Sequence, residues 1–184
     1  MGHRLSRITT RTGDDGTTGL ADGSRYPKDH PRIALLGELD ELNSAVGMVR
    51  AQPLPPEVAE VLAEIQQRLF DLGGEVALPV ATGRLDAGAV AALEQALQTW
   101  NAALPPLREF ILPSGTPAAA ASHLARAICR RVERHWVSVQ RQDTLNPHGL
   151  HYLNRLSDLL FILARHLNRQ AQHAEPQWRG WSHD

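Results

Sequence analysis

Residues 150–170 read "LHYLNRLSDLLFILARHLNRQ", and their leucines recur at every third or fourth position. Because an α-helix makes one turn in about 3.6 residues, this spacing puts the leucines on one face of a single long helix. A helix with one apolar stripe has to bury that stripe against other elements. The stripe consists of Leu153, Leu156, Leu160, Leu163 and Leu167.

The same period recurs in four stretches that precede this one in the chain. It predicts helices from Pro31 to about Gln52, from Pro55 or Pro56 through Val76, over residues 86–103, and from Pro117 to about Arg141. Proline is tolerated in the first turn of a helix, and Thr116 stands where a capping side chain belongs. No stretch shows the alternation of a strand, so the sequence predicts an all-α five-helix bundle.

The 184 residues fit one domain. We expect an extended or looped arm without regular structure over residues 1–31, the bundle over 32–170, and a surface or partly disordered tail over 171–184. A net charge of −1 and the lack of a long apolar run argue against nucleic-acid and membrane partners. One cysteine and no apolar leader favour a reducing, cytoplasmic location.

The arm contains "TRTGDDGTTGL" at residues 10–20, in which glycines and threonines surround an arginine. Glycine lets backbone N–H groups approach an anion, and threonine adds hydroxyl donors. The stretch lacks the Lys-Ser/Thr ending of a Walker A loop and the sheet that such a loop needs. An anion-binding loop and an ordinary glycine-rich turn both remain open, since Asp14 and Asp15 repel phosphate unless a cation bridges them.

Three arginines, Arg126, Arg130 and Arg134, follow one another at intervals of four on the helix from Pro117. They share one helix face, which is either a solvated basic face or a face opposite an anion. Asp40 is a candidate acid beside the leucines of the first helix. Asn154 and Asp158 interrupt the leucine-rich fifth helix, where they can bond either a ligand or another helix.

Catalysis by a metal or a protein nucleophile finds no support in these residues. The sequence has no Glu-x-x-His pair, and its nine histidines lack ligand spacing, so we predict no metal-ligating residues. Cys129 lies on an apolar helix and is expected in the core.

Six stretches, in this order, resemble the PduO-type ATP:cob(I)alamin adenosyltransferases: "TRTGDDGTTGL", "RYPKDHPR", "GELDELNSAVG", "FILPSG", "RAICRRVER" and "YLNRLSDLLF". The resemblance spans roughly residues 7–168. It implies a ferritin-like five-helix bundle that assembles as a homotrimer, with ATP and the corrinoid at each interface. It implies transfer of the 5′-deoxyadenosyl group of ATP to the cobalt of cob(I)alamin, with triphosphate released. Cobalt(I) is then the nucleophile, so the protein needs none.

The resemblance also assigns roles to individual residues. Its ATP-binding positions fall on Thr10, Arg11, Thr12, Gly13, Thr18, Gly19, Lys28, Arg130, Arg131, Glu133, Arg134 and Asn154. Arg130 would stabilise the leaving triphosphate, and Asp40 and Arg126 would form an ion pair between subunits. Phe110 would displace the lower axial ligand of the corrinoid, which makes cobalt(II) four-coordinate and easier to reduce. The family often has lysine where Arg11 stands, which keeps the charge and changes the geometry.

The resemblance further implies Mg²⁺ with the triphosphate, a flavoprotein reductase that supplies electrons, and an adenosylcobalamin-dependent acceptor enzyme. Two alternatives remain: an ATP-binding bundle without chemistry, acting as a sensor or partner-binding module, and a purely structural bundle. Phe110 separates the first from the enzyme, because an ATP sensor needs no aromatic residue beneath a corrin ring.

Overall fold

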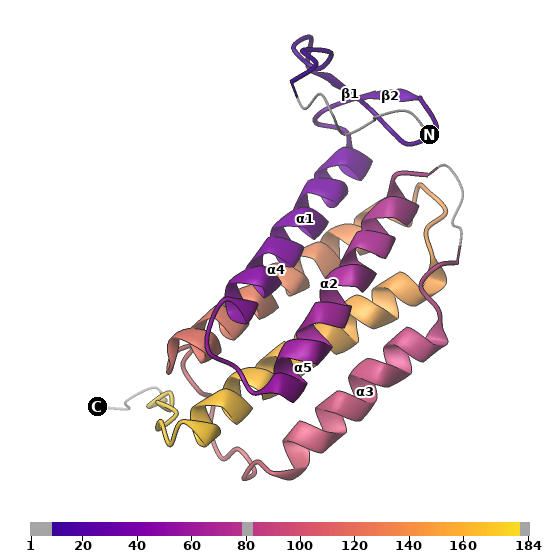
Figure 1. The fold of residues 1–184 in the computed structure, drawn as a ribbon. Coiled ribbons are helices and arrows are strands. Elements are labelled where there is room, and N and C mark those ends of the chain that lie inside the picture. The colour runs from indigo at the N-terminus through magenta and orange to yellow at the C-terminus, as the bar shows by residue number, and fades with distance from the viewer. Residues whose placement is uncertain (1–8, 79–82, 181–184) are drawn as a thin grey trace.

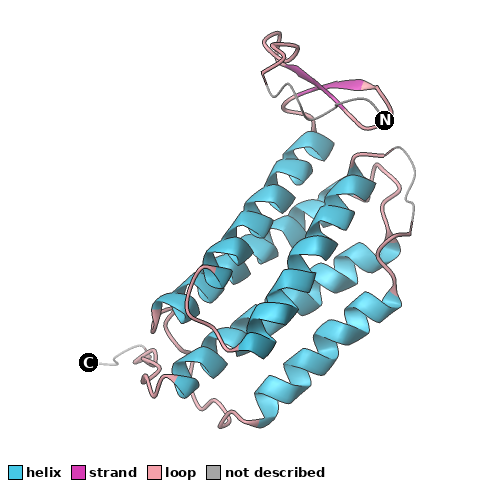
Figure 2. Ribbon diagram, in the orientation of Figure 1, coloured by secondary structure: helices cyan, strands magenta, loops and turns pink. Residues whose placement is uncertain are grey.

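The computed structural model describes residues 9–78 and 83–180 and shows five α-helices over those ranges (Figures 1 and 2). The helices are α1 (Pro31–Arg50), α2 (Pro56–Val76), α3 (Ala87–Ala102), α4 (Pro117–Val139) and α5 (Pro147–Gln170). They lie side by side as a bundle, which confirms the predicted fold class.

The helix starts follow the capping residues in the sequence. Thr116 Oγ1 accepts a hydrogen bond from Ala119 N at 3.2 Å, as predicted for an N-cap. Asn146 caps α5 in the same way, because its Oδ1 accepts from His148 N at 2.9 Å. With Pro147 in the first turn, α5 therefore begins slightly before the expected start at Leu150.

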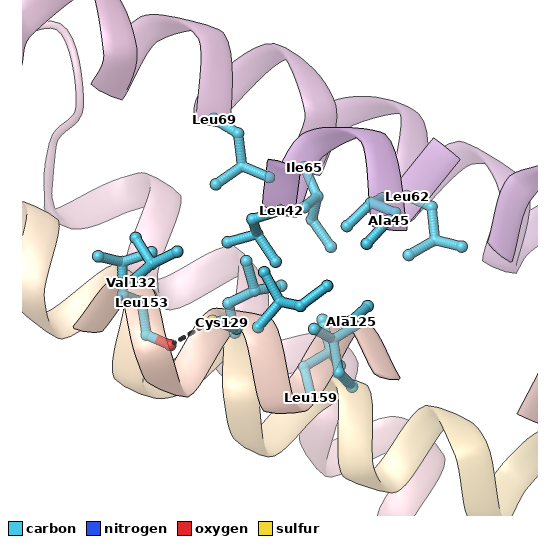
Figure 3. Close-up of a cluster of buried hydrophobic side chains, with 14 of the residues drawn as sticks. Leu42, Ala45, Leu62, Ile65, Leu69, Ala125, Cys129, Val132, Leu153 and Leu159 are labelled. Carbon is cyan, nitrogen blue, oxygen red and sulfur yellow. Dashed lines mark hydrogen bonds between the residues drawn. The ribbon is translucent and has the colours of Figure 1, made fainter. Parts of the chain in front are cut away.

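The core is the apolar space between α1, α2, α4 and α5 (Figure 3). All five leucines of the α5 stripe are buried there, at 0–5% exposure. Helix α3 packs on α5 and buries only Leu93 and Trp100. Burial of these stripes is the main source of stability, at about 25 cal/mol per Å² of apolar surface.

The arm is more regular than expected, because it contains a β-hairpin. Strand β1 (Thr17–Gly19) pairs antiparallel with β2 (Arg25–Pro27), and Thr18 lies opposite Tyr26. Asp22 closes the turn by accepting from Ser24 N at 2.9 Å, and Gly23 supplies a φ of +87°. The prediction of an arm without regular structure was therefore wrong over residues 17–27. Strands of three residues are too short to show alternation.

The hairpin and the α3–α4 loop (residues 103–116) lie at opposite ends of the bundle. The hairpin stands beyond the N-terminal end of α1, whereas α3 leads into the α3–α4 loop at the other end (Figure 1). Among the described residues, no helix is long and apolar enough to cross a membrane.

The tail is at the surface, as expected, and as far as residue 180 it is held in place. Leu112 N donates to Pro176 O at 2.8 Å, and Trp178 N donates to Phe110 O at 2.7 Å. The intervening Ile111 faces Gln177 in an isolated antiparallel bridge. Part of the tail thus runs beside the α3–α4 loop, while residues 181–184 lie outside the described ranges.

Candidate functional site

An open cleft of about 750 Å³ lies between α3, α4, α5 and the α3–α4 loop. Three residues that the sequence singled out, Phe110, Arg126 and Arg130, line this cleft together. The α5 residues Asp158 and Phe161 line it as well. An apolar hollow with a few convergent charged groups is the usual form of a ligand site.

Phe110 is 75% exposed, which is unusual for a large apolar side chain in an ordered loop. Its ring meets the ring of Trp178 edge to face, with the centroids 6.4 Å apart. The rest of the ring remains available to a ligand. Burying it against an apolar partner would release free energy that the free protein does not use.

Arg126 and Arg130 lie one turn apart on α4, and neither forms an ion pair with any described residue. Arg126 lies over the ring of Phe161 at 5.8 Å, and its Nε is buried without a hydrogen-bond partner. Burial, and then the neighbouring charge of Arg130, lower the pKa of Arg126. Two uncompensated guanidinium groups in one cleft are suited to an anion.

The remaining candidates on α4 divide into two groups. Arg134 donates to the carbonyl oxygen of Arg130 at 2.9 Å and thus stays beside it. Arg131 instead forms ion pairs with Glu38 and Glu41 of α1. The structure therefore brings Arg134 to the basic row and turns Arg131 toward another helix.

Asn154 and Glu133 form a contact between α5 and α4. Asn154 Nδ2 donates to Glu133 Oε1 at 2.9 Å, and Asn154 Oδ1 accepts from Arg155 Nη1 at 3.1 Å. Both side chains are half-buried, and these bonds already satisfy the amide of Asn154 within the chain. A ligand that used either group would have to share or replace these bonds.

Asp40 does not meet Arg126 within the chain. It is exposed beside a separate hollow of about 330 Å³ between α1 and α2, which Phe70 and Gly73 also line. Among the described residues Asp40 forms no ion pair.

In the arm, Lys28 lies against the turn that begins at Gly13. A Cβ atom on Gly13 would lie 3.1 Å from Thr17 O and 3.2 Å from Lys28 Nζ, so only glycine fits there without displacing its neighbours. Arg11 adopts a φ of +60°, which is uncommon for a residue other than glycine and is concentrated at functional turns. The hydroxyls of Thr10 and Thr12 lie 2.9 Å apart.

Asp15 and Arg25 hold this turn together. Asp15 Oδ1 accepts from Thr17 N at 2.9 Å and from Thr17 Oγ1 at 2.8 Å, and these bonds lower the pKa of the Asp15 carboxyl. Arg25 donates to Thr12 O at 2.6 Å and lies 3.6 Å from Asp15. Asp15 therefore sets the turn. Sequence reasoning missed Arg25, because its partners lie across a hairpin that was not predicted.

The remaining strand positions of the arm, Thr18 and Gly19, pair with Tyr26 and Arg25. No hydrogen bond or ion pair joins the described arm to Arg126 or Arg130 of the same chain. One chain thus provides two parts of the predicted site without bringing them together.

Cys129 is buried and is not part of the cleft. Its Sγ donates to Leu153 O at 3.2 Å (Figure 3), and burial strongly raises the pKa of the thiol. Residues 9–78 and 83–180 contain no group of three or more His, Cys, Asp or Glu side chains arranged to hold a metal ion.

Known proteins are similar to this chain in both sequence and fold. A cobalamin adenosyltransferase from Cupriavidus metallidurans is 52% identical over 97% of each chain, and a corrinoid adenosyltransferase from Mycobacterium bovis is 41% identical over 91% of this chain and 92% of the relative. A PduO-type ATP:corrinoid adenosyltransferase from Lactobacillus reuteri superposes with a TM-score of 0.88 and 35% identity, covering 95% of this chain and all of the other. That relative was solved with cobalamin and ATP, in a variant with alanine in place of a phenylalanine.

The pattern that describes the cobalamin adenosyltransferase family matches residues 8–167, which is most of the chain. Together with the five-helix bundle and the near full-length relatives, this match shows that the chain belongs to the cobalamin adenosyltransferase family.

Proposed function

We propose that this protein transfers the 5′-deoxyadenosyl group of ATP to the cobalt of cob(I)alamin and releases triphosphate. The observation that carries the proposal is the cleft that exposed Phe110 lines together with Arg126 and Arg130, two arginines that form no ion pair within the described part of the chain. An apolar ring beside two free guanidinium groups fits an apolar macrocycle next to an anionic leaving group.

In the reaction, the electron pair of cobalt(I) forms a bond to the ribose C5′ atom. The bond from C5′ to the triphosphate oxygen breaks, and its electron pair leaves with the triphosphate. No proton has to move at the reacting carbon, so the reaction does not need Cys129, which is buried and protonated, as a base or nucleophile. The protein contributes by aligning the two substrates and by stabilising the charge that develops on triphosphate.

Arg130 is the residue that we assign to this developing charge. It is exposed on the cleft side of α4, has no carboxylate partner among the described residues, and carries Arg134 beside it. Asn154 and Glu133 are assigned to the nucleotide further along α5 and α4. Arg131 is assigned to it as well, but it would first have to release its ion pairs with Glu38 and Glu41.

The arm is assigned to the phosphates of ATP. The absence of a side chain at Gly13 lets the ammonium group of Lys28 lie close to the backbone of the Thr12–Thr17 turn. Thr10, Arg11, Thr18 and Gly19 complete this surface. Asp15 is already engaged by Thr17 and Arg25, so it does not oppose the phosphates as a free charge.

Mg²⁺ is expected to enter with the triphosphate. Among the described residues no carboxylate cluster offers a preformed site, so the phosphate oxygens would provide most of its ligands. The arm carboxylate of Asp14 is exposed, so it is accessible to such an ion.

A homotrimer would complete the site. The arm and the α3–α4 loop lie at opposite ends of one bundle (Figure 1). Asp40 and Arg126 line different hollows. A neighbouring copy can supply the missing part of each pair. Sizing chromatography with light scattering tests the assembly, and a monomer that is fully active would contradict it.

Phe110 is assigned to the lower face of the corrin ring, where it displaces the axial ligand from cobalt(II). Four-coordinate cobalt(II) accepts an electron more easily, which suits a flavoprotein reductase as the donor. The product would then pass to an adenosylcobalamin-dependent enzyme.

An anaerobic turnover assay tests the central proposal. Chemically reduced cob(I)alamin, ATP and the folded protein should give the absorption spectrum of adenosylcobalamin. If ATP binds and no adenosylcobalamin forms, the protein is an ATP-binding module without chemistry. The exposed ring of Phe110 favours the adenosyltransferase over an ATP-binding module, because ATP binding alone does not require an exposed aromatic ring in the cleft.

A further inference from the structure

The last two turns of α5 carry two buried polar side chains that the proposed reaction does not use. Arg165 is 4% exposed and Asn168 is 1% exposed. Burying a charged or polar group is costly unless specific partners compensate for the lost water. Their partners therefore indicate what these two residues hold in place.

Arg165 joins the α3–α4 loop to the tail. Its Nη2 donates to the carbonyl oxygen of Pro105 at 2.9 Å. Its Nε lies 3.3 Å from both carboxylate oxygens of Glu175, which gives an ion pair in a poorly solvated position. One buried guanidinium thus ties the start of the loop and the start of the ordered tail to the same helix turn.

Beyond Glu175, the tail runs directly along the residue that lines the cleft. Trp178 N donates to Phe110 O at 2.7 Å, and Leu112 N donates to Pro176 O at 2.8 Å. These two bonds lie on either side of Ile111 and fix the backbone at Phe110. Within the loop, Phe110 N donates to Oε1 of the adjacent Glu109 at 2.8 Å, but residues 105–110 are exposed and form no helix or strand that would hold them against the bundle.

Asn168 holds the other end of the loop. Its Oδ1 accepts from Thr116 N at 3.0 Å, and its Nδ2 donates to Ser114 O at 3.3 Å. Gly115 has a φ of +116°, and a Cβ there would lie 2.1 Å from Asn168 Oδ1. The loop therefore has one fixed end at Asn168 and a second attachment that depends on Arg165 and Glu175.

We propose that Arg165 is a positioning residue that holds Phe110 in the cleft by locking the Glu175–Trp178 segment against the α3–α4 loop. The inference rests on the proposed function and deepens it. An aromatic ring that displaces an axial ligand has to be backed by a rigid support, because a mobile loop would yield instead. Without the Arg165–Glu175 pair, each binding event would have to order the loop and the tail, and the entropy cost of that ordering would weaken binding.

The consequence is confined to the step that needs Phe110. Reduction of cob(II)alamin requires the axial ligand to leave, whereas supplied cob(I)alamin has already passed that step. Loss of the lock should therefore impair the first route much more than the second. ATP binding at Arg130 and in the arm should not change, since Arg165 contacts neither.

Two variants test the lock, Arg165→Gln and Glu175→Gln. Glu175 lies on the surface tail, so its variant remains informative if the buried Arg165→Gln chain does not fold. Arg68→Gln is the matched control, because Arg68 also forms ion pairs, with Glu64 and Asp71, on α2 outside the cleft. The first readout is amide hydrogen exchange at Leu112 and Trp178, which needs no substrate.

We expect exchange at these two amides to quicken about tenfold or more in both variants, the effect of losing one bond to a charged group. The four-coordinate fraction of bound cob(II)alamin should fall about tenfold, and turnover of cob(I)alamin should stay within about threefold. Unchanged exchange, or equal losses by both routes, would overturn the lock. Wild-type protein that fails with cob(I)alamin would refute the proposed function instead, and the exchange data would still decide whether Arg165 holds the loop.

Discussion

Replacement of Phe110 by alanine should damage one route to the product far more than the other. A phenylalanine side chain can bury about 150–250 Å², and Phe110 leaves 75% of its surface exposed. A ligand can therefore cover about 150 Å², which at about 25 cal/mol per Å² sets an upper limit of about 4 kcal/mol. If half to all of this drives the axial ligand from cobalt, Phe110→Ala should slow turnover of cob(II)alamin by about 30- to 900-fold.

The same substitution should change the stability of the folded protein very little. Only a small part of the Phe110 ring is buried, against Trp178, so the free energy of unfolding should fall by less than about 1 kcal/mol. The assay compares initial rates with cob(II)alamin plus a mild reductant and with chemically reduced cob(I)alamin, both with ATP under anaerobic conditions. Met48→Ala is the control, since Met48 is 59% exposed on α1 and does not line the cleft.

Equal losses by the two routes would refute the displacement role of Phe110. A large fall in the free energy of unfolding of Phe110→Ala would show that the ring is well packed in the free protein. It would therefore refute the role of the ring as a free surface for a ligand.

Three further predictions concern the fold around the site. Glu75 is buried and accepts from Leu85 N at 3.0 Å and from Asn146 Nδ2 at 2.8 Å, so Glu75→Ala leaves two donors unsatisfied and should cost about 2–5 kcal/mol in denaturant unfolding, against less than about 0.5 for exposed Glu60→Ala. A loss as small as that of Glu60→Ala would contradict this. Burial, and then Arg126, lower the pKa of His123 from 6.5, so the folded state resists its protonation, and stability should decline as the pH falls below about 6.5. His123→Phe should flatten that decline, and an unchanged slope would assign it to other groups. The thiol of Cys129, with its raised pKa, should react with a thiol reagent only as fast as the protein opens, and rapid native labelling would show that the α4–α5 core is looser than described.

The bundle could be predicted from the sequence because its signals are local. Leucines three and four residues apart define a helix face wherever they occur, and Thr116 followed by Pro117 marks a helix start within two positions. The alignment of Arg126 with Arg130 likewise follows from helix geometry, and the structure places both in one cleft. The assignment of Arg130 to triphosphate, and of Arg126 to an ion pair with Asp40 of another subunit, stays a prediction.

The features that were missed depend on contacts between distant segments. The hairpin consists of strands of three residues whose register is set by a turn, so no periodic pattern announces it. The sequence does not predict the attachment of the tail, because its partners, Phe110 and Leu112, lie far away in the sequence. Helix geometry already turns Arg131 away from the basic row, but only the packing of α1 on α4 shows that Glu38 and Glu41 bind it.

The separation of the arm from the cleft has a genetic consequence. A lesion at Lys28 falls in the arm and a lesion at Arg130 falls on α4, so each leaves the other half of the predicted site intact. If sites form between copies, coexpression of the two inactive chains should restore activity, in about a quarter of the sites when chains mix at random. Two alleles that are both damaged in the arm, or both in the cleft, should never restore activity to each other. Coexpression therefore shows whether a substitution damages the arm or the cleft.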